Sequence, residues 1–167
     1  ATGTDGQVLT SAGAGAVPSF ETLASAANTP AFLVKASSGQ SVSNGTHTQA
    51  VFDTEVIDTD TAFASNVFTV PSGKAGKYFL FAQLGMQNWN ASRFLIQLQK
   101  TPSGGSTADL SGSESAIGTV GYHTTMTLTI ADLSVGDAIK VNIYHTNGST
   151  QTLSVGDRTI FMGYKLT

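Results

Sequence analysis

Short apolar runs separated by turn residues fill the chain from Pro30 onward. Side chains of a β-strand alternate between two faces, so apolar residues with a period of two indicate a strand with one buried face. Residues 94–99 and 139–144 show this alternation and are rich in β-branched or aromatic side chains. No stretch combines helical spacing of apolar residues with capping residues. The pattern predicts an all-β sandwich or barrel.

Two longer runs have unusual faces. In residues 120–130 the even-numbered positions are mostly apolar, whereas the odd-numbered positions are mostly Thr. We expect the apolar face to be the core face, opposite a hydroxyl-bearing one. Residues 78–86 begin with apolar side chains on both faces, because Phe79 and Phe81 alternate with other apolar residues. This predicts a strand that is buried on both sides or lies against a partner subunit.

The first 29 residues differ in composition, being dominated by Ala, Gly, Ser and Thr. Such a segment cannot bury enough apolar surface to fold alone. Its apolar side chains form two short anchors, in which Val8, Leu9 and Phe20 are available for attachment. We therefore divide the chain into an extended connector, residues 1–29, and a head domain, residues 30–167.

A five-residue sequence, Leu-Ser-Val-Gly-Asp, occurs at residues 133–137 and again at residues 153–157. A solenoid normally needs at least three copies of its repeat. We therefore interpret both copies as turns, in which Gly permits a positive φ and Asp bonds nearby backbone donors.

Polarity in this chain comes from hydroxyl groups more than from charge. Asp, Glu, Lys and Arg make up 11% of its 167 residues, against about 25% in an ordinary soluble domain. With 8 basic and 11 acidic residues the net charge is −3, and no basic cluster is present, so we expect no nucleic-acid partner. The apolar runs are too short to span a bilayer, so we expect no membrane insertion. The absence of Cys excludes disulfides and thiolate chemistry.

The residues that enzymes and zinc sites need do not occur in a suggestive arrangement. The sequence lacks a Gly-x-Ser-x-Gly nucleophile elbow, and we expect no enzymatic activity and no catalytic residue. His47, His123 and His145 are too far apart in sequence to suggest a zinc site within one chain. One His from each chain of a three-fold assembly could still form a three-nitrogen zinc site on the axis.

The densest group of carboxylates lies in residues 53–60. Oxygen ligands suit calcium, and Asp58 and Asp60 are the candidate metal ligands. The segment lacks the Gly and the final Glu of a helix-loop-helix calcium loop. Interleaved Thr residues favour a solvated strand edge, whose charges discourage edge-to-edge pairing. We therefore expect no cofactor, with calcium at this pair as the alternative.

The only Trp lies in a polar segment, residues 87–93, which we expect to form a loop between two strands. An aromatic ring flanked by amides and Arg is a composition that stacks on a sugar and hydrogen-bonds its hydroxyls. The candidate contacts for a host-surface glycan are therefore Asn88, Trp89, Asn90 and Arg93. The alternative, which the usual burial of large aromatics favours, places Trp89 within the sandwich or against a neighbouring subunit.

Five short motifs follow one another along the head. They are Ala-Val-Phe-Asp at residues 50–53, Phe-Thr-Val-Pro at 68–71, Gly-Lys-Tyr-Phe-Leu-Phe at 76–81, Leu-Ser-Val-Gly-Asp-Ala-Ile-Lys-Val at 133–141 and Phe-Met-Gly-Tyr-Lys-Leu at 161–166. With a first strand beginning at Pro30, this order resembles the globular head of complement component 1q. That head belongs with the tumour-necrosis-factor-like jelly rolls.

The resemblance implies a jelly-roll sandwich of about ten strands that assembles as a homotrimer. The excess of apolar faces on residues 78–86 supports the same assembly. We expect trimer contacts from aromatic side chains of this strand and of the last one, namely Tyr78, Phe79, Phe81, Phe161 and Tyr164.

The connector contains Gly-Thr-Asp-Gly-Gln-Val-Leu-Thr-Ser at residues 3–11 and Gly-Ala-Val-Pro-Ser-Phe at residues 15–20. This resembles a segment of bacteriophage fibre and tail proteins, with Phe20 where that segment has Trp. The resemblance implies a virion structural protein, assembled in the bacterial cytoplasm, that contacts other virion proteins through residues 1–29.

Together the two resemblances predict a non-enzymatic fibre or fibre-tip head of a bacteriophage, used for particle attachment or host adhesion. One alternative is a capsid-surface protein, a head fibre or decoration protein without a specific receptor. The other is a secreted bacterial ligand-binding module with the same fold.

Overall fold

The computed structural model describes residues 2–22, 28–90, 93–116 and 118–166, which contain strands and no helix. No helix of these residues is long and apolar enough to cross a membrane. The strands are β1 Gln7–Thr10, β2 Ser19–Thr22, β3 Ala31–Ala36, β4 Ser41–Val42, β5 Thr48–Gln49, β6 Thr54–Asp58, β7 Phe63–Ala64, β8 Val67–Thr69, β9 Gly76–Trp89, β10 Phe94–Thr101, β11 Ala108–Ser115, β12 Val120–Leu133, β13 Ala138–His145, β14 Gln151–Thr152 and β15 Gly156–Lys165.

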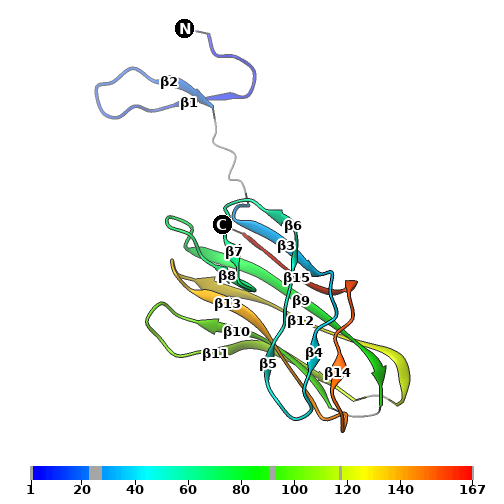
Figure 1. Cartoon of the computed structure of the whole chain (residues 1–167). Coiled ribbons are helices and arrows are strands. Elements are labelled where there is room, and N and C mark those ends of the chain that lie inside the picture. The colour runs from blue at the N-terminus through cyan, green and yellow to red at the C-terminus, as the bar shows by residue number, and fades with distance from the viewer. Residues whose placement is uncertain (1, 23–27, 91–92, 117, 167) are drawn as a thin grey trace.

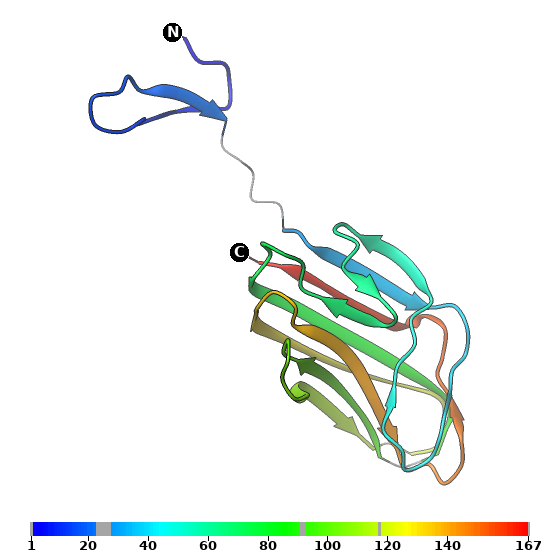
Figure 2. The same cartoon turned by 60° about the vertical axis from the view of Figure 1, so that its left-hand side comes forward.

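Two antiparallel sheets packed face to face form most of the head, and β4 pairs with β14 in a separate two-stranded sheet (Figures 1 and 2). The first, here called the β9 sheet, has the strand order β12-β9-β15-β3-β6. The second, the β10 sheet, has the order β11-β10-β13-β8-β7, with β5 paired to β13. Consecutive long strands such as β9 and β10 lie in different sheets, so the chain crosses between layers as in a jelly roll. The prediction of an all-β jelly roll is confirmed.

The core lies between the two sheets and is rich in aromatic rings. Phe32 of β3 stacks on Phe68 of β8 with ring centroids 4.5 Å apart and meets the edge of Phe161 of β15 at 4.8 Å. Burying a side chain of this size contributes about 1.5–3 kcal/mol. Gly163 makes room for the cluster, because a Cβ there would lie 2.8 Å from the Phe32 ring. Strands far apart in the sequence thus share one apolar layer.

The two faces of β12 are reversed relative to our expectation. Leu128 and Ile130 are 55% and 62% exposed, whereas Thr125 and Thr127 are buried. β11 supplies the reason, because the hydroxyls of Thr127 and Ser111 are hydrogen-bonded at 2.7 Å. Buried hydroxyl groups are tolerated where they find such partners. The hydroxyl-bearing face therefore closes the sandwich, and the apolar face lies outside.

The two copies of Leu-Ser-Val-Gly-Asp adopt different structures. The first forms a turn between β12 and β13, with Gly136 at φ 83° and Asp137 buried. The Asp137 carboxylate accepts a hydrogen bond from Ser134 N–H at 2.9 Å and pairs with Lys100 Nζ at 2.5 Å. In the second copy Asp157 already belongs to β15. The turn prediction is therefore confirmed for the first copy. In the second copy Gly156 has the expected positive φ, 66°, but β15 begins at this residue, so the predicted turn is wrong there.

A small hairpin of β1 and β2 lies within the segment that the sequence suggests is an extended connector. Leu9 faces Phe20 across the two strands. The Phe20 ring covers Gly3, where a Cβ would come within 2.6 Å of the ring. Leu9 and Phe20 nevertheless remain exposed. Figures 1 and 2 show the hairpin apart from the two sheets of the head.

Candidate functional site on two sheet faces

The outward side of the β9 sheet carries a set of apolar side chains, here called the apolar face. The strand register aligns them in rows across the sheet, such as Leu128, Phe81 and Met162. In the neighbouring row the rings of Phe79 and Tyr164 lie 5.5 Å apart. The apolar face consists of Leu33, Ile57, Phe79, Phe81, Met126, Leu128, Ile130, Ile160, Met162 and Tyr164.

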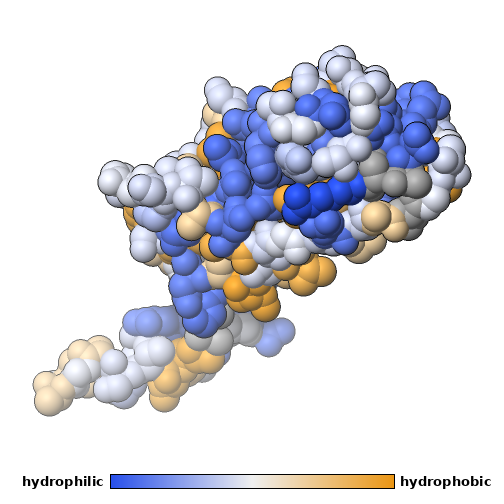
Figure 3. Space-filling model, turned by 90° about the horizontal axis from the view of Figure 1, so that it is seen from below, coloured by the Kyte–Doolittle hydropathy of each residue, from blue (hydrophilic) through white to orange (hydrophobic). Residues whose placement is uncertain are grey.

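Apolar side chains gathered in this way indicate a contact surface. Single exposed apolar residues are common on soluble proteins, but contiguous apolar patches mark sites of interaction. Figure 3 views the molecule from below and shows hydrophobic side chains in clusters on a mostly hydrophilic surface.

The apolar face contains three of the five predicted trimer contacts. Phe79, Phe81 and Tyr164 point outward and are partly exposed. Tyr78 and Phe161 are fully buried inside the single chain, so their assignment to a subunit contact is wrong. Neighbouring residues of a strand point to opposite faces, which separates Tyr78 from Phe79. Met126, Leu128 and Ile130 of β12 also belong to the apolar face. Sequence reasoning did not assign them to it, although the alternation of apolar residues in this strand is visible in the sequence.

Trp89 is a core residue, and its assignment to a glycan contact is wrong. β9 continues to Trp89 instead of ending before it, and alternation turns the indole inward, where it is fully buried. The indole lies 5.2 Å from the Phe94 ring and 5.4 Å from the His123 ring. The alternative prediction, in which Trp89 packs within the sandwich, is confirmed.

The other three candidate glycan contacts are exposed and partly engaged within the chain. The Asn90 side chain accepts a hydrogen bond from the Thr119 hydroxyl at 2.9 Å. Arg93 forms an ion pair with Glu114 at 2.8 Å and lies over the Tyr144 ring at 5.3 Å. Asn88 is exposed at the end of β9 and has a φ of 50°. Residues 91 and 92 lie outside the described residues.

The candidate calcium ligands serve other contacts. Asp58 accepts hydrogen bonds from the backbone N–H groups of Ala62 and Phe63 at 2.9 and 3.0 Å. Asp60 pairs with Lys74 at 3.3 Å. In the described part of the chain, no group of three His, Cys, Asp or Glu side chains could hold a metal ion. Calcium binding by Asp58 and Asp60 stays a prediction, and no third carboxylate or His ligand among the described residues supports it.

None of the three histidines belongs to the apolar face, and a zinc site shared between three chains stays a prediction. His123 and His145 are buried within the sandwich, and His47 is exposed beside the β10 sheet. His123 Nε2 lies 2.6 Å from the Ser115 hydroxyl. Burial lowers the pKa of His123. Its ring is therefore a neutral hydrogen-bonding group of the interior at neutral pH.

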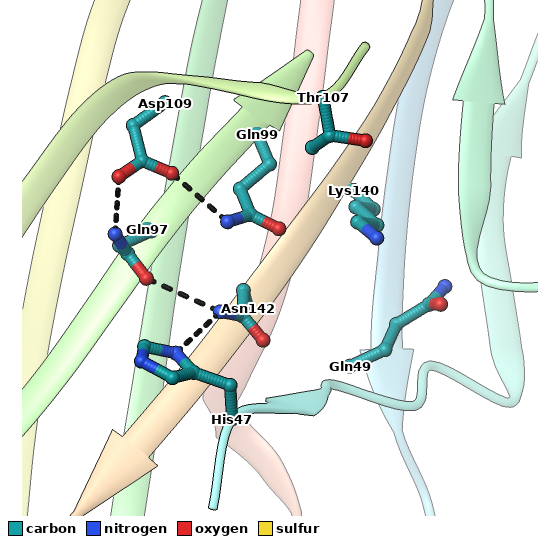
Figure 4. Close-up of a pocket in the computed structure, with 8 residues that line it drawn as sticks. All are labelled: His47, Gln49, Gln97, Gln99, Thr107, Asp109, Lys140 and Asn142. Atoms are coloured by element: carbon teal, nitrogen blue, oxygen red, sulfur yellow. Dashed lines mark hydrogen bonds between the residues drawn. The ribbon is translucent and has the colours of Figure 1, made fainter. Parts of the chain in front are cut away.

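A polar groove of about 570 Å³ occupies the outward side of the β10 sheet (Figure 4). Its floor is formed by β10 and β13, whose register places Gln97 opposite Asn142 and Gln99 opposite Lys140. Asp109 of β11 lies opposite Gln99 on the other side. The groove is lined by His47, Gln49, Gln97, Gln99, Thr107, Asp109, Lys140 and Asn142.

A chain of hydrogen bonds crosses this groove. Gln97 and Gln99 each donate a side-chain N–H to the Asp109 carboxylate. Asn142 Nδ2 donates to Gln97 Oε1 at 3.1 Å and to His47 Nδ1 at 2.8 Å. Figure 4 shows this chain running from Asp109 through Gln97 and Asn142 to His47. The sequence offered one signal for the groove, the alternation of Gln with apolar residues in β10.

A buried ion pair holds the floor strands together. Asp137, which precedes β13, pairs with Lys100 of β10. Burial alone would raise the pKa of Asp137, but hydrogen bonds from Lys100 and Ser134 N–H outweigh burial and lower it. The carboxylate is therefore charged at neutral pH and fixes the entry of β13 against β10.

Comparison with known proteins shows what this architecture is similar to. No family model matches the chain, and no curated protein matches it. Among solved structures, murine APRIL at pH 5.0 has a TM-score of 0.65 and 16% identity over 81% of this chain and 98% of that one. The globular domain of zebrafish complement 1qA has a TM-score of 0.61 and 14% identity over 83% of this chain and 98% of that one. The head therefore has the jelly-roll fold that tumour-necrosis-factor-family and complement 1q globular domains share.

Proposed function

We propose that this chain is the head of a non-enzymatic, homotrimeric bacteriophage virion protein, a fibre or fibre tip used for attachment or host adhesion. The observation that carries the trimer is the apolar face of the β9 sheet. Full burial of a side chain such as Leu128 contributes about 1.5–3 kcal/mol. Ten such side chains in one face supply enough free energy to hold subunits together. A monomer that leaves these side chains exposed to solvent does not gain this free energy.

The connector supports the virion role. Its likeness to bacteriophage fibre and tail segments covers residues 3–11 and 15–20, which include β1 and the first half of β2. Leu9 is 61% exposed and Phe20 is 39% exposed, so both remain available for contact with another protein. An exposed apolar pair on a small hairpin suits docking to a neighbouring component of the particle.

Light scattering coupled to size exclusion tests the trimer directly. We expect the full chain to elute at three times its mass of 17.2 kDa. A monomeric mass at micromolar concentration would refute the homotrimer.

The attachment role is tested with the virion itself. We expect mass spectrometry of purified particles to detect the chain, and Leu9→Asp combined with Phe20→Asp to remove it from particles while the trimer mass is unchanged. A secreted ligand-binding module, which the polar groove favours, predicts the opposite result. In that case the chain would occur in culture supernatant without particles.

A further inference from the structure

We propose that the groove on the β10 sheet binds a sugar that carries a carboxylate beside its hydroxyl groups, as a uronic acid does. The ligand would lie across β10 and β13, with hydroxyls on the amides of Gln99 and Asn142 and the carboxylate on Lys140. This site is distinct from the segment around Trp89 and is formed by one chain alone.

The hydrogen-bond chain fixes the orientation of the groove's amides. A carboxylate only accepts hydrogen bonds, so Asp109 forces the NH₂ groups of Gln97 and Gln99 toward itself. Gln97 Oε1 must then face Asn142, whose NH₂ group donates a hydrogen bond to it. That NH₂ group also donates to His47 Nδ1, so the His47 proton lies on Nε2. One acidic residue thereby pre-orients four polar side chains.

Pre-orientation leaves a defined set of groups for a ligand. Gln99 Oε1 and Asn142 Oδ1 accept no hydrogen bond from the described residues. Lys140 Nζ has no ion pair or hydrogen bond within the same part of the chain. Asn142 is itself only 7% exposed, and its NH₂ group is held by His47 and Gln97.

The spacing of these groups fits one sugar ring. Lys140 lies directly opposite Gln99 and two residues before Asn142 on the same face of β13. Side chains in such positions are separated by about 5–7 Å, which is similar to the breadth of a pyranose ring with its substituents. Ring hydroxyls can donate to the two amide oxygens, and the ammonium group is left for a carboxylate.

One end of the groove has a flat wall, because the His47 ring packs on Tyr144 with centroids 4.8 Å apart. The volume of about 570 Å³ lies within the usual range of ligand sites.

Other ligand classes fit the groove poorly. Nucleic acid needs several phosphate-neutralising side chains, and the groove offers only Lys140. An apolar peptide needs hydrophobic pockets, whereas every lining side chain is polar. As a means of host adhesion the site rests on the proposed function, but sugar binding itself requires neither the trimer nor the virion.

Side-chain amide resonances give a direct test. Sodium glucuronate, glucose and sodium acetate are added at millimolar concentrations to the ¹⁵N-labelled full chain. We expect glucuronate to shift the side-chain NH₂ signals of Gln97, Gln99 and Asn142. Glucose should bind more weakly at the same signals, and acetate alone should leave them unchanged.

Variants separate the two halves of the proposed site. Lys140→Met should weaken glucuronate binding by about tenfold or more, to the level of glucose, because it removes one charge-assisted hydrogen bond. Gln99→Met should weaken both sugars. Gln87→Met makes the same substitution on β9, outside the groove, and should leave binding unchanged.

Three results would overturn the proposal. They are the absence of any shift with glucuronate, shifts that persist in Gln99→Met, and equal shifts with glucose or acetate. Light scattering on the same sample reports the trimer independently. A failed sugar titration of an intact trimer therefore rejects the groove and leaves the proposed function standing.

Discussion

The two sheets of the head carry opposite chemistry on their outward sides. The β9 sheet presents large apolar side chains such as Phe81 and Leu128, whereas the β10 sheet presents the amides of Gln97 and Asn142. Both sets follow the same two-residue alternation over the same core. A jelly roll can therefore present two chemically different outer faces around one shared core.

The contrast between these faces extends into the interior. Behind the apolar face, β12 turns Thr127 inward to meet Ser111. Behind the groove, β10 turns Ile96 and Leu98 inward, which is the ordinary arrangement of a surface strand. On β12 the inward positions thus carry hydroxyl groups and the outward positions carry hydrocarbon side chains. In the trimer that we propose, this outer side is buried.

The largest expected effect comes from placing a charge in the apolar face. Leu128→Asp should cost about 2 kcal/mol of burial in each chain, and about 6 kcal/mol in a trimer, because three copies of the side chain are lost. We expect light scattering to report a monomer that retains its β-sheet circular dichroism.

Leu95→Asp is the matched control, since Leu95 points outward on the β10 sheet. It should leave the trimer mass unchanged. If both variants dissociate, or neither does, the two faces do not differ in the way proposed.

The next effect concerns the core that both faces share. Trp89→Ala should lower the free energy of unfolding by about 3–5 kcal/mol, because it empties a fully buried site. Urea denaturation measures this loss. Asn88→Gly is the control, since Asn88 is exposed and glycine readily adopts its φ of 50°. If Trp89→Ala and the unmodified chain had equal stability, the assignment of Trp89 to the core would be contradicted, and Trp89 would again be a candidate surface contact.

A matched pair of carboxylates compares the two sheets further. The Asp137 side chain beside β13 is 4% exposed, and the Asp157 side chain on β15 is 91% exposed. Asp137→Asn should lower the free energy of unfolding by about 3 kcal/mol, because it leaves Lys100 without its buried partner. Asp157→Asn removes only a surface pair with Lys35 and should have no measurable effect.

The pH dependence of this pair follows from the pKa of Asp137, which is lower in the folded chain than its ordinary value. Its contribution is present above the unfolded pKa of about 3.9 and is lost as the pH falls through the lowered folded value. Urea denaturation at neutral and acidic pH should show the difference between Asp137→Asn and the unmodified chain shrinking in acid. A difference that stays constant would show that the charge of Asp137 is not responsible.

The smallest expected effect tests the inverted interior of β12. Thr127→Val keeps the shape of the side chain but removes the hydroxyl that bonds Ser111, and should cost about 1 kcal/mol of stability. Thr124→Val on the outward side of the same strand should cost less. Thermal unfolding of the two variants measures the difference, and the reverse order would contradict the assignment of the faces.

The sequence by itself was sufficient for the fold class. Period-two alternation in residues 94–99 and 139–144 reports a local property, the direction of successive side chains, and both runs are strands of the β10 sheet. The five motifs of the head likewise indicate a jelly roll, which is the fold of the two packed sheets. The two-sided apolar character of residues 78–86 indicated that one face of this strand lies outside the core, but not which one, and the structure places Phe79 and Phe81 on that face.

Tertiary structure alone decided which face of each strand became the interior. Alternation in β12 separates apolar from hydroxyl-bearing side chains, but only the serines of β11 make the hydroxyl side a suitable inner face. The two copies of Leu-Ser-Val-Gly-Asp have the same sequence but different surroundings. Asp137 pairs with Lys100 in the interior, whereas Asp157 is exposed to solvent. The groove depends on residues from four strands and two loops. Such positions are set by long-range strand pairing, which local sequence patterns do not encode.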